Sequence, residues 1–302
     1  MLVSILRAIC NVNGTHTKSP IRKLRKLDKI FKIKESPKGF VQTWNRTSKG
    51  VRFLSIENEE KKADQILLYL HGGGYISGLI STYPLFLTKL ASNHKIICLD
   101  YKCAPEAIFP SQLLEALELW RYLTEEENID PSDIIIGGDS AGANLMFALL
   151  LTLRDCGQPL PKCGFSISAW ADMTGCSNSF SQNYNKDPLF GELKNPLTEE
   201  KRKRMMHSEL YSFIGKKKRD NPLISPIFGK YHNFIPICFI VGENEMLLDD
   251  TLTIVEKLKQ EEIPCPCFIA PKMYHIFPIL TPFVKEAKLA IHFIQEFLNE
   301  QT

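Results

Sequence analysis

A serine held between small residues has the clearest chemical meaning in this sequence. Residues 138–142 read Gly-Asp-Ser-Ala-Gly, follow an apolar run at 134–136 and lead into a helical period that begins at Ala141. A strand that turns sharply into a helix exposes the hydroxyl of a serine at the turn, and flanking glycines prevent collisions with the neighbouring elements. The pattern therefore predicts that Ser140 is a nucleophile.

A glycine-rich run supplies a second part of such a site. His71-Gly-Gly-Gly74 comes directly after the apolar run at 65–70. Glycines let backbone amides approach a substrate carbonyl closely, where the amides can stabilise the negative oxygen that forms during acyl transfer. We expect the amides of Gly73, Gly74 and Ala141 to form this oxyanion hole. An ordinary glycine-rich turn is the alternative interpretation.

A serine nucleophile needs a base and an acid. Where the chain order is serine, acid, histidine, the base follows the last strand, and His275 lies in that place. The acid should follow the preceding strand-like run at 235–241. Four carboxylates come shortly after it: Glu243, Glu245, Asp249 and Asp250. Residue types alone do not choose among them.

The combined motifs resemble those of the hormone-sensitive-lipase-type (bacterial family IV) carboxylesterases of the α/β-hydrolase superfamily. The resemblance covers about residues 65–300. Its matching positions are His71 to Tyr75, Asp100-Tyr101, Ala104 to Glu106, Asp130-Pro131, Gly138 to Gly142, Asn144, Trp170, Asp172, Ser225-Pro226, Leu247 to Asp249 and Tyr274-His275. Lys102, Ala143 and Ala169 depart from the residues usual in the family, and none of these changes removes a reacting group.

The resemblance implies a serine hydrolase that cleaves carboxylic esters of short to medium acyl chain through an acyl-enzyme, without a metal or an organic cofactor. The family places its acid two residues before a Leu and four before an Asp, which selects Glu245 over Asp249 and Glu243. The implied triad is thus Ser140, Glu245 and His275. Two alternatives stay open: an arylacetamide-type amide deacetylase, and a non-catalytic small-molecule receptor such as the related gibberellin receptors, which lack the histidine.

Short β-rich runs alternate with longer helical periods from about residue 51 onward, as expected for a mostly parallel sheet covered by helices on both faces. The predicted strands are 51–56, 65–70, 95–101, 133–137, 164–168, 235–241 and 264–270. The predicted helices are 82–92, 111–124, 141–154, 248–262 and 282–298. With the resemblance, this order predicts an α/β-hydrolase fold with an eight-stranded sheet and a small helical cap.

Two segments interrupt the alternation, residues 1–45 and about 172–222. The resemblance implies that they form a cap on a catalytic domain of residues 46–302. Within the first segment, apolar residues share one helical face opposite several lysines and arginines: Ile21, Leu24, Leu27 and Phe31. We expect this helix to pack on the main domain, and contact with an anionic membrane surface is the alternative.

Composition narrows the function classes further. The chain has 302 residues, 44% of them hydrophobic, and a net charge of +3 that is too evenly balanced to indicate nucleic-acid binding. Nine cysteines, an odd number without a metal-binding spacing, favour a reducing compartment, so we expect a cytoplasmic protein. An N-terminal anchor or signal in the apolar residues 1–10 is the alternative. We expect a small ester as partner and a monomer or homodimer.

Overall fold

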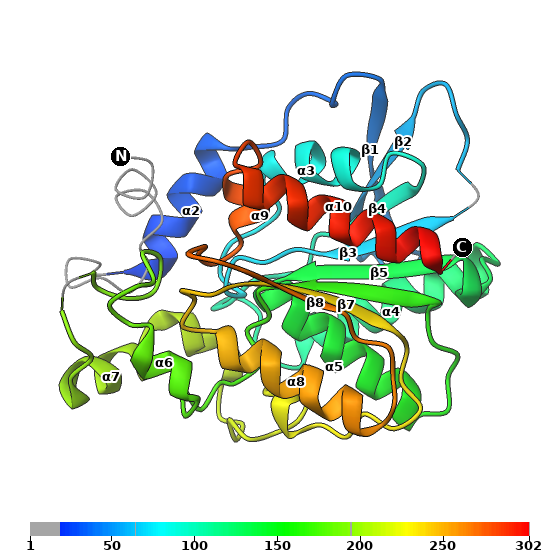
Figure 1. Ribbon diagram of the computed structural model, residues 1–302. Coiled ribbons are helices and arrows are strands. Elements are labelled where there is room, and N and C mark those ends of the chain that lie inside the picture. The colour runs from blue at the N-terminus through cyan, green and yellow to red at the C-terminus, as the bar shows by residue number, and fades with distance from the viewer. Residues whose placement is uncertain (1–18, 64, 194, 302) are drawn as a thin grey trace.

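A twisted sheet crosses the molecule, with helices on both of its faces (Figure 1). The computed structural model describes residues 19–63, 65–193 and 195–301. The eight strands are β1 (Phe40–Arg46), β2 (Arg52–Asn58), β3 (Ile66–Leu70), β4 (Lys95–Leu99), β5 (Ile134–Asp139), β6 (Cys163–Ile167), β7 (Ile237–Gly242) and β8 (Cys267–Ala270). Their order is β1-β2-β4-β3-β5-β6-β7-β8, antiparallel from β1 to β4 and parallel from β4 to β8. The predicted fold class is confirmed.

The central strands are apolar because both of their faces are covered. Every residue of β3, β5 and β7 is buried. The register places Leu70, the last residue of β3, opposite Gly138 near the end of β5. The glycine-rich run after β3 and the serine after β5 therefore leave the sheet side by side.

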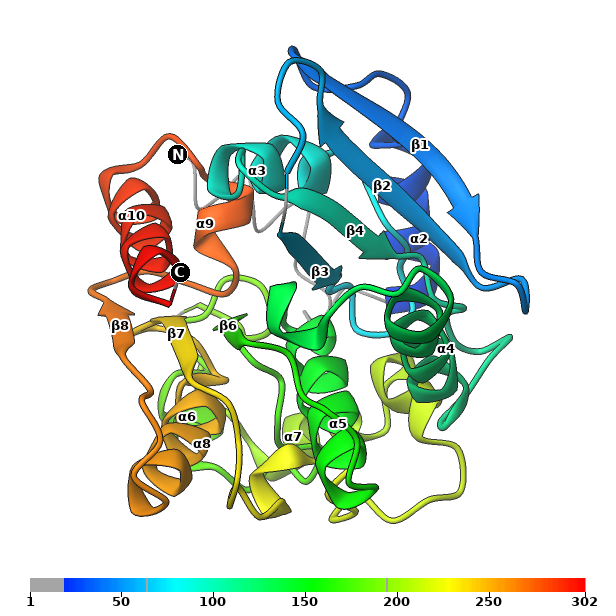
Figure 2. The same ribbon diagram turned by 90° about the vertical axis from the view of Figure 1, so that its right-hand side faces the viewer.

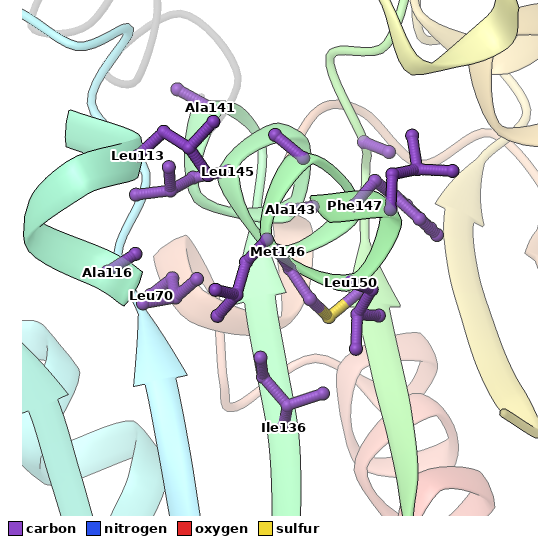
Figure 3. Close-up of a cluster of buried hydrophobic side chains, with 14 of the residues drawn as sticks. Leu70, Leu113, Ala116, Ile136, Ala141, Ala143, Leu145, Met146, Phe147 and Leu150 are labelled. Carbon is purple, nitrogen blue, oxygen red and sulfur yellow. The ribbon is translucent and has the colours of Figure 1, made fainter. Parts of the chain in front are cut away.

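The helices divide between the two faces, with α3 and α10 on one side and α5 and α8 on the other (Figures 1 and 2). Their bounds are α2 (Pro20–Ile30), α3 (Thr82–Leu90), α4 (Ser111–Arg121), α5 (Ala141–Asp155), α6 (Asn178–Gln182), α7 (Glu199–Met206), α8 (Leu248–Gln260), α9 (Phe277–Leu280) and α10 (Lys285–Glu300). Leu68 and Leu70 of β3 belong to the core under α5, whereas Leu67 and Tyr69 belong to the core under α3 and α10. Figure 3 shows Leu145 and Met146 of α5 within the first of these cores.

Strand β1 was not predicted. It pairs with β2 at the edge of the sheet, and its residues alternate between exposed and half-buried positions. Such an edge strand contains many polar residues and lacks the continuous apolar run of a central strand. Residues 40–45, which the sequence analysis assigned to the cap segment 1–45, thus belong to the sheet. The division into a cap and a catalytic domain otherwise stays a prediction.

The predicted amphipathic helix is α2, and it packs on the main domain through Ile21 and Leu24. It lies at the same end of the molecule as α6 and α7 from the second cap segment (Figure 1). None of the helices in the described ranges is long and apolar enough to cross a membrane. The proposed anchor at residues 1–10 falls outside those ranges.

Candidate active site

Ser140 occupies the turn between β5 and α5. Its φ of 52° and ψ of −119° lie outside the usual regions for a residue with a side chain, and surrounding structure must hold it there. The two glycines on either side of Ser140 allow this tight turn to pack against its neighbours. A Cβ on Gly138 would lie 2.7 Å from the carbonyl carbon of Gly142, and a Cβ on Gly142 would lie 2.0 Å from the carbonyl oxygen of Leu70. The turn is therefore possible only without these side chains.

His275 lies in the loop after β8 and contacts both other members of the predicted triad. Its Nε2 is 2.9 Å from the Ser140 Oγ, and its Nδ1 is 3.0 Å from the Glu245 Oε2. In the tautomer that donates from Nδ1 to the carboxylate, Nε2 can accept the serine proton. All three side chains are buried. The structure thus brings together residues that are 135 positions apart in sequence.

The Glu245 carboxylate is held from its other side as well. Its Oε1 accepts hydrogen bonds from the Ser168 hydroxyl at 2.7 Å and from the Gly242 amide at 2.6 Å. A carboxylate with these donors has little freedom to turn away from His275. The sequence analysis missed Ser168, which follows β6 and belongs to none of the motifs.

The other candidate acids have different partners. Glu243 accepts a hydrogen bond from the Lys272 amide at 3.0 Å. Asp249, at the start of α8, accepts one from the Ser179 amide of α6 at 2.8 Å. Both carboxylates thus stabilise local structure, and the acid that contacts His275 is the one that the family spacing selects.

The glycine-rich run faces the same site. Gly73 and Gly74 line a cavity together with Ser140 and His275. Both glycines have positive φ, 105° and 62°, which favours glycine. Ala141 begins α5, so its amide is one of those that have no carbonyl partner within the helix. These are the three residues from which an oxyanion hole was expected.

The Asp139 side chain holds the glycine-rich run through a hydrogen bond to Gly72 and through two tyrosines. Its carboxylate accepts hydrogen bonds from the Tyr69 hydroxyl at 2.8 Å, the Gly72 amide at 2.9 Å and the Tyr83 hydroxyl at 3.2 Å. Burial raises the pKa of Asp139 to about 6, although these donors act in the opposite direction. Asp139 therefore positions the glycine-rich run through these three hydrogen bonds.

Comparison with known proteins identifies the family of this chain. A family model described as alpha/beta hydrolase fold matches residues 67–279, well over half of the chain. The crystal structure of an esterase from the bacterial hormone-sensitive lipase family superposes with a TM-score of 0.86, at 29% identity and over 99% of this chain and 96% of that one. The chain belongs to the hormone-sensitive-lipase branch of the α/β-hydrolases. The resemblance seen in the sequence is confirmed, and the protein is an esterase of this family.

Two bacterial relatives have related descriptions. An esterase of Acinetobacter venetianus is 29% identical over 82% of this chain and 80% of its own length. An acetyl-hydrolase of Streptomyces hygroscopicus is 31% identical over 78% of this chain and 76% of its own length. Both alignments include the greater part of each protein.

The cavity of this esterase has a volume of about 130 Å³ and mostly apolar walls. Distant parts of the chain form it: Leu24 and Leu27 of α2, Leu189, Phe190 and Leu210 of the second cap segment, and Ile276 and Leu280 after the triad histidine. The Phe190 ring lies edge-on to the imidazole of His275, with ring centroids 4.7 Å apart. The sequence analysis placed a cap at both segments but did not identify these wall residues, because apolar cap residues form no pattern that separates a pocket from a core.

Proposed function

We propose that this esterase hydrolyses carboxylic esters of short to medium acyl chain through an acyl-enzyme on Ser140. The hydrogen-bonded series from Ser140 through His275 to Glu245, with distances of 2.9 and 3.0 Å, carries the proposal. Ser140 Oγ attacks the carbonyl carbon while His275 Nε2 takes its proton, and Glu245 stabilises the resulting imidazolium. The amides of Gly73, Gly74 and Ala141 stabilise the oxyanion.

Collapse of the tetrahedral intermediate breaks the bond to the alcohol, which leaves with the proton from His275. Water then attacks the acyl-enzyme, with His275 again as the base, and releases the carboxylic acid and free Ser140. The balance needs only ester and water, and no redox step is involved.

The cavity supports the proposed chain length. An apolar cavity of about 150 Å³ holds one benzene molecule, so about 130 Å³ suits an acyl group of a few carbons. The acetyl-hydrolase relative points in the same direction. Long acyl chains would have to extend out of this cavity.

A series of p-nitrophenyl esters tests the proposal. We expect kcat/KM to be highest between the acetate and the hexanoate and to be far lower for the palmitate. Ser140→Ala should reduce turnover by a factor on the order of 10⁶ and should abolish labelling by a fluorophosphonate probe. Equal rates for wild type and Ser140→Ala would refute the hydrolase mechanism. A higher kcat/KM for p-nitroacetanilide than for p-nitrophenyl acetate would favour the amide deacetylase instead.

We also propose a cytoplasmic location, because the cysteines in the described ranges are all free thiols. Whether the esterase is a monomer or a homodimer stays a prediction, to be decided by light scattering.

A further inference from the structure

Helix α2 contacts the loop that follows the oxyanion glycines. The Arg25 guanidinium donates from Nε to the Ile76 carbonyl at 3.2 Å and from Nη2 to the Ala104 carbonyl at 2.9 Å. Glu106 forms an ion pair with the same guanidinium, so its charge is balanced. A single side chain of α2 thus connects two loops of the main domain.

Asp28, one helical turn further along α2, contacts the next two residues of that loop. Its carboxylate accepts a hydrogen bond from the Ser77 hydroxyl and another from the Gly78 amide, the latter at 3.3 Å. Three successive residues, 76 to 78, are therefore held by two side chains of α2.

Two of these three residues, Ile76 and Ser77, in turn contact Gly73. The Gly73 carbonyl accepts hydrogen bonds from the Ile76 and Ser77 amides, each at 3.1 Å. Space around this glycine is so restricted that a Cβ on it would lie 2.9 Å from the Ser77 carbonyl oxygen. A shift of residues 76 to 78 would therefore move the peptide that joins Gly73 to Gly74, which carries the Gly74 amide, one of the expected oxyanion donors.

The N-terminal end of α2 is bound to the second cap segment, residues 172–222. Glu209 Oε2 accepts hydrogen bonds from the Ser19 hydroxyl at 2.7 Å and from the Ile21 amide at 3.1 Å. The adjacent Leu210 lies against the second oxyanion glycine, where a Cβ on Gly74 would be 2.9 Å from its Cδ2. Helix α2 thus connects the second cap segment with the loop that follows the oxyanion glycines.

We propose that Arg25 and Asp28 are positioning residues that hold the oxyanion loop in its active conformation. This inference rests on the proposed esterase function. Asp28 borders the cavity, but both residues act by holding residues 76 to 78. Arg25 does so through the Ile76 carbonyl, and Asp28 through the Ser77 hydroxyl and the Gly78 amide. Oxyanion donors stabilise the transition state more than the bound ester, so a loosened loop lowers kcat and has little effect on KM.

Substitution of both residues tests the inference. With p-nitrophenyl butyrate, Asp28→Ala and Arg25→Met should each lower kcat by roughly 10- to 100-fold, as expected for a small displacement of catalytic groups, while KM changes by less than about 3-fold. Asp28→Asn should restore most of the activity, because the amide can accept from Gly78 and donate to Ser77. Lys26→Met and Lys29→Met, on the exposed side of α2, are the matched controls and should behave as wild type.

A second measurement separates positioning from general destabilisation. A trifluoromethyl ketone adds to the serine and places its oxyanion where the amides bind, so its affinity should fall in parallel with kcat/KM in Asp28→Ala and Arg25→Met. Rates are expressed per active site, titrated with a fluorophosphonate. An unchanged kcat per active site in both variants would overturn the inference, and so would equal losses in the two lysine controls. Wild-type protein without turnover or labelling would instead refute the proposed function.

Discussion

Glu245 owes its orientation to hydrogen bonds that leave one oxygen for the triad histidine. Glu245→Gln keeps most of the shape but loses the charge that stabilises the imidazolium and the tautomer, so we expect kcat to fall by about 10⁴-fold. Asp249→Asn is the matched control, because that carboxylate contacts the Ser179 amide, and it should retain near wild-type kcat. Steady-state rates with p-nitrophenyl butyrate check this. Loss of activity in Asp249→Asn with full activity in Glu245→Gln would reverse the assignment.

Asp139 should make stability depend on pH. Burial raises its pKa in the folded protein to about 6, above the value of about 3.9 in an unfolded chain. The folded state therefore binds the proton more tightly, and the contribution of this group to stability is lost as pH rises towards 6 and beyond. Relative to Asp139→Asn, which cannot titrate, wild type should gain roughly 1.5 kcal/mol in free energy of unfolding between pH 7.5 and pH 5. Urea unfolding of both proteins at the two pH values measures the free energies. A difference between wild type and Asp139→Asn that stays the same at both pH values would contradict the prediction.

At the residue scale, motifs predicted the groups that carry the reaction but not the groups that hold them. The serine turn and the glycine-rich run can be recognised in the sequence because both require small residues at fixed spacing. Ser168, Arg25 and Asp28 act through hydrogen bonds to residues distant in the chain. In the sequence they cannot be told apart from ordinary polar residues of the surface. Only the three-dimensional arrangement distinguishes them.

At the scale of elements, α5 both presents the nucleophile and fills the core beneath it. Leu150 of α5 is fully buried, and Figure 3 shows it beside Met146. Leu150→Ala should lower the free energy of unfolding by about 2 to 5 kcal/mol, because it leaves a cavity between helix and sheet. Leu114→Ala on α4, where the side chain is 59% exposed, should change it by less than about 0.5 kcal/mol. Denaturant unfolding compares the two, and equal effects would show that the core does not depend on α5 as described.

The hydrophobic pattern predicted the strands of the sheet centre and the edge strand β8, but it missed the edge strand β1. Strands β3 to β7 are continuous apolar runs, so their positions were evident from the sequence. Strand β1 has one exposed face and many polar residues, so the hydrophobic pattern did not reveal it. The structure identifies it by its antiparallel pairing with β2. A strand buried on both faces is thus easier to predict from sequence than a polar edge strand such as β1.

At the scale of the whole molecule, the substrate cavity exists only where α2, the second cap segment and the catalytic loops meet. Leu27→Trp should reduce the cavity, so kcat/KM for the hexanoate ester should fall at least about 10-fold more than that for the acetate ester. Lys29→Trp, on the exposed side of the same helix, is the control and should leave the ratio unchanged. A ratio unaffected by Leu27→Trp would mean that the acyl chain lies elsewhere.

The distance along the chain between Ser140 and His275 has a consequence for biosynthesis. A ribosome completes the nucleophile more than a hundred residues before it adds the base. Any nascent or prematurely terminated polypeptide that ends before residue 275 carries the serine without its proposed base. Hydrolysis by the proposed triad therefore begins only after residue 275 has been synthesised and the two residues have been brought together by folding.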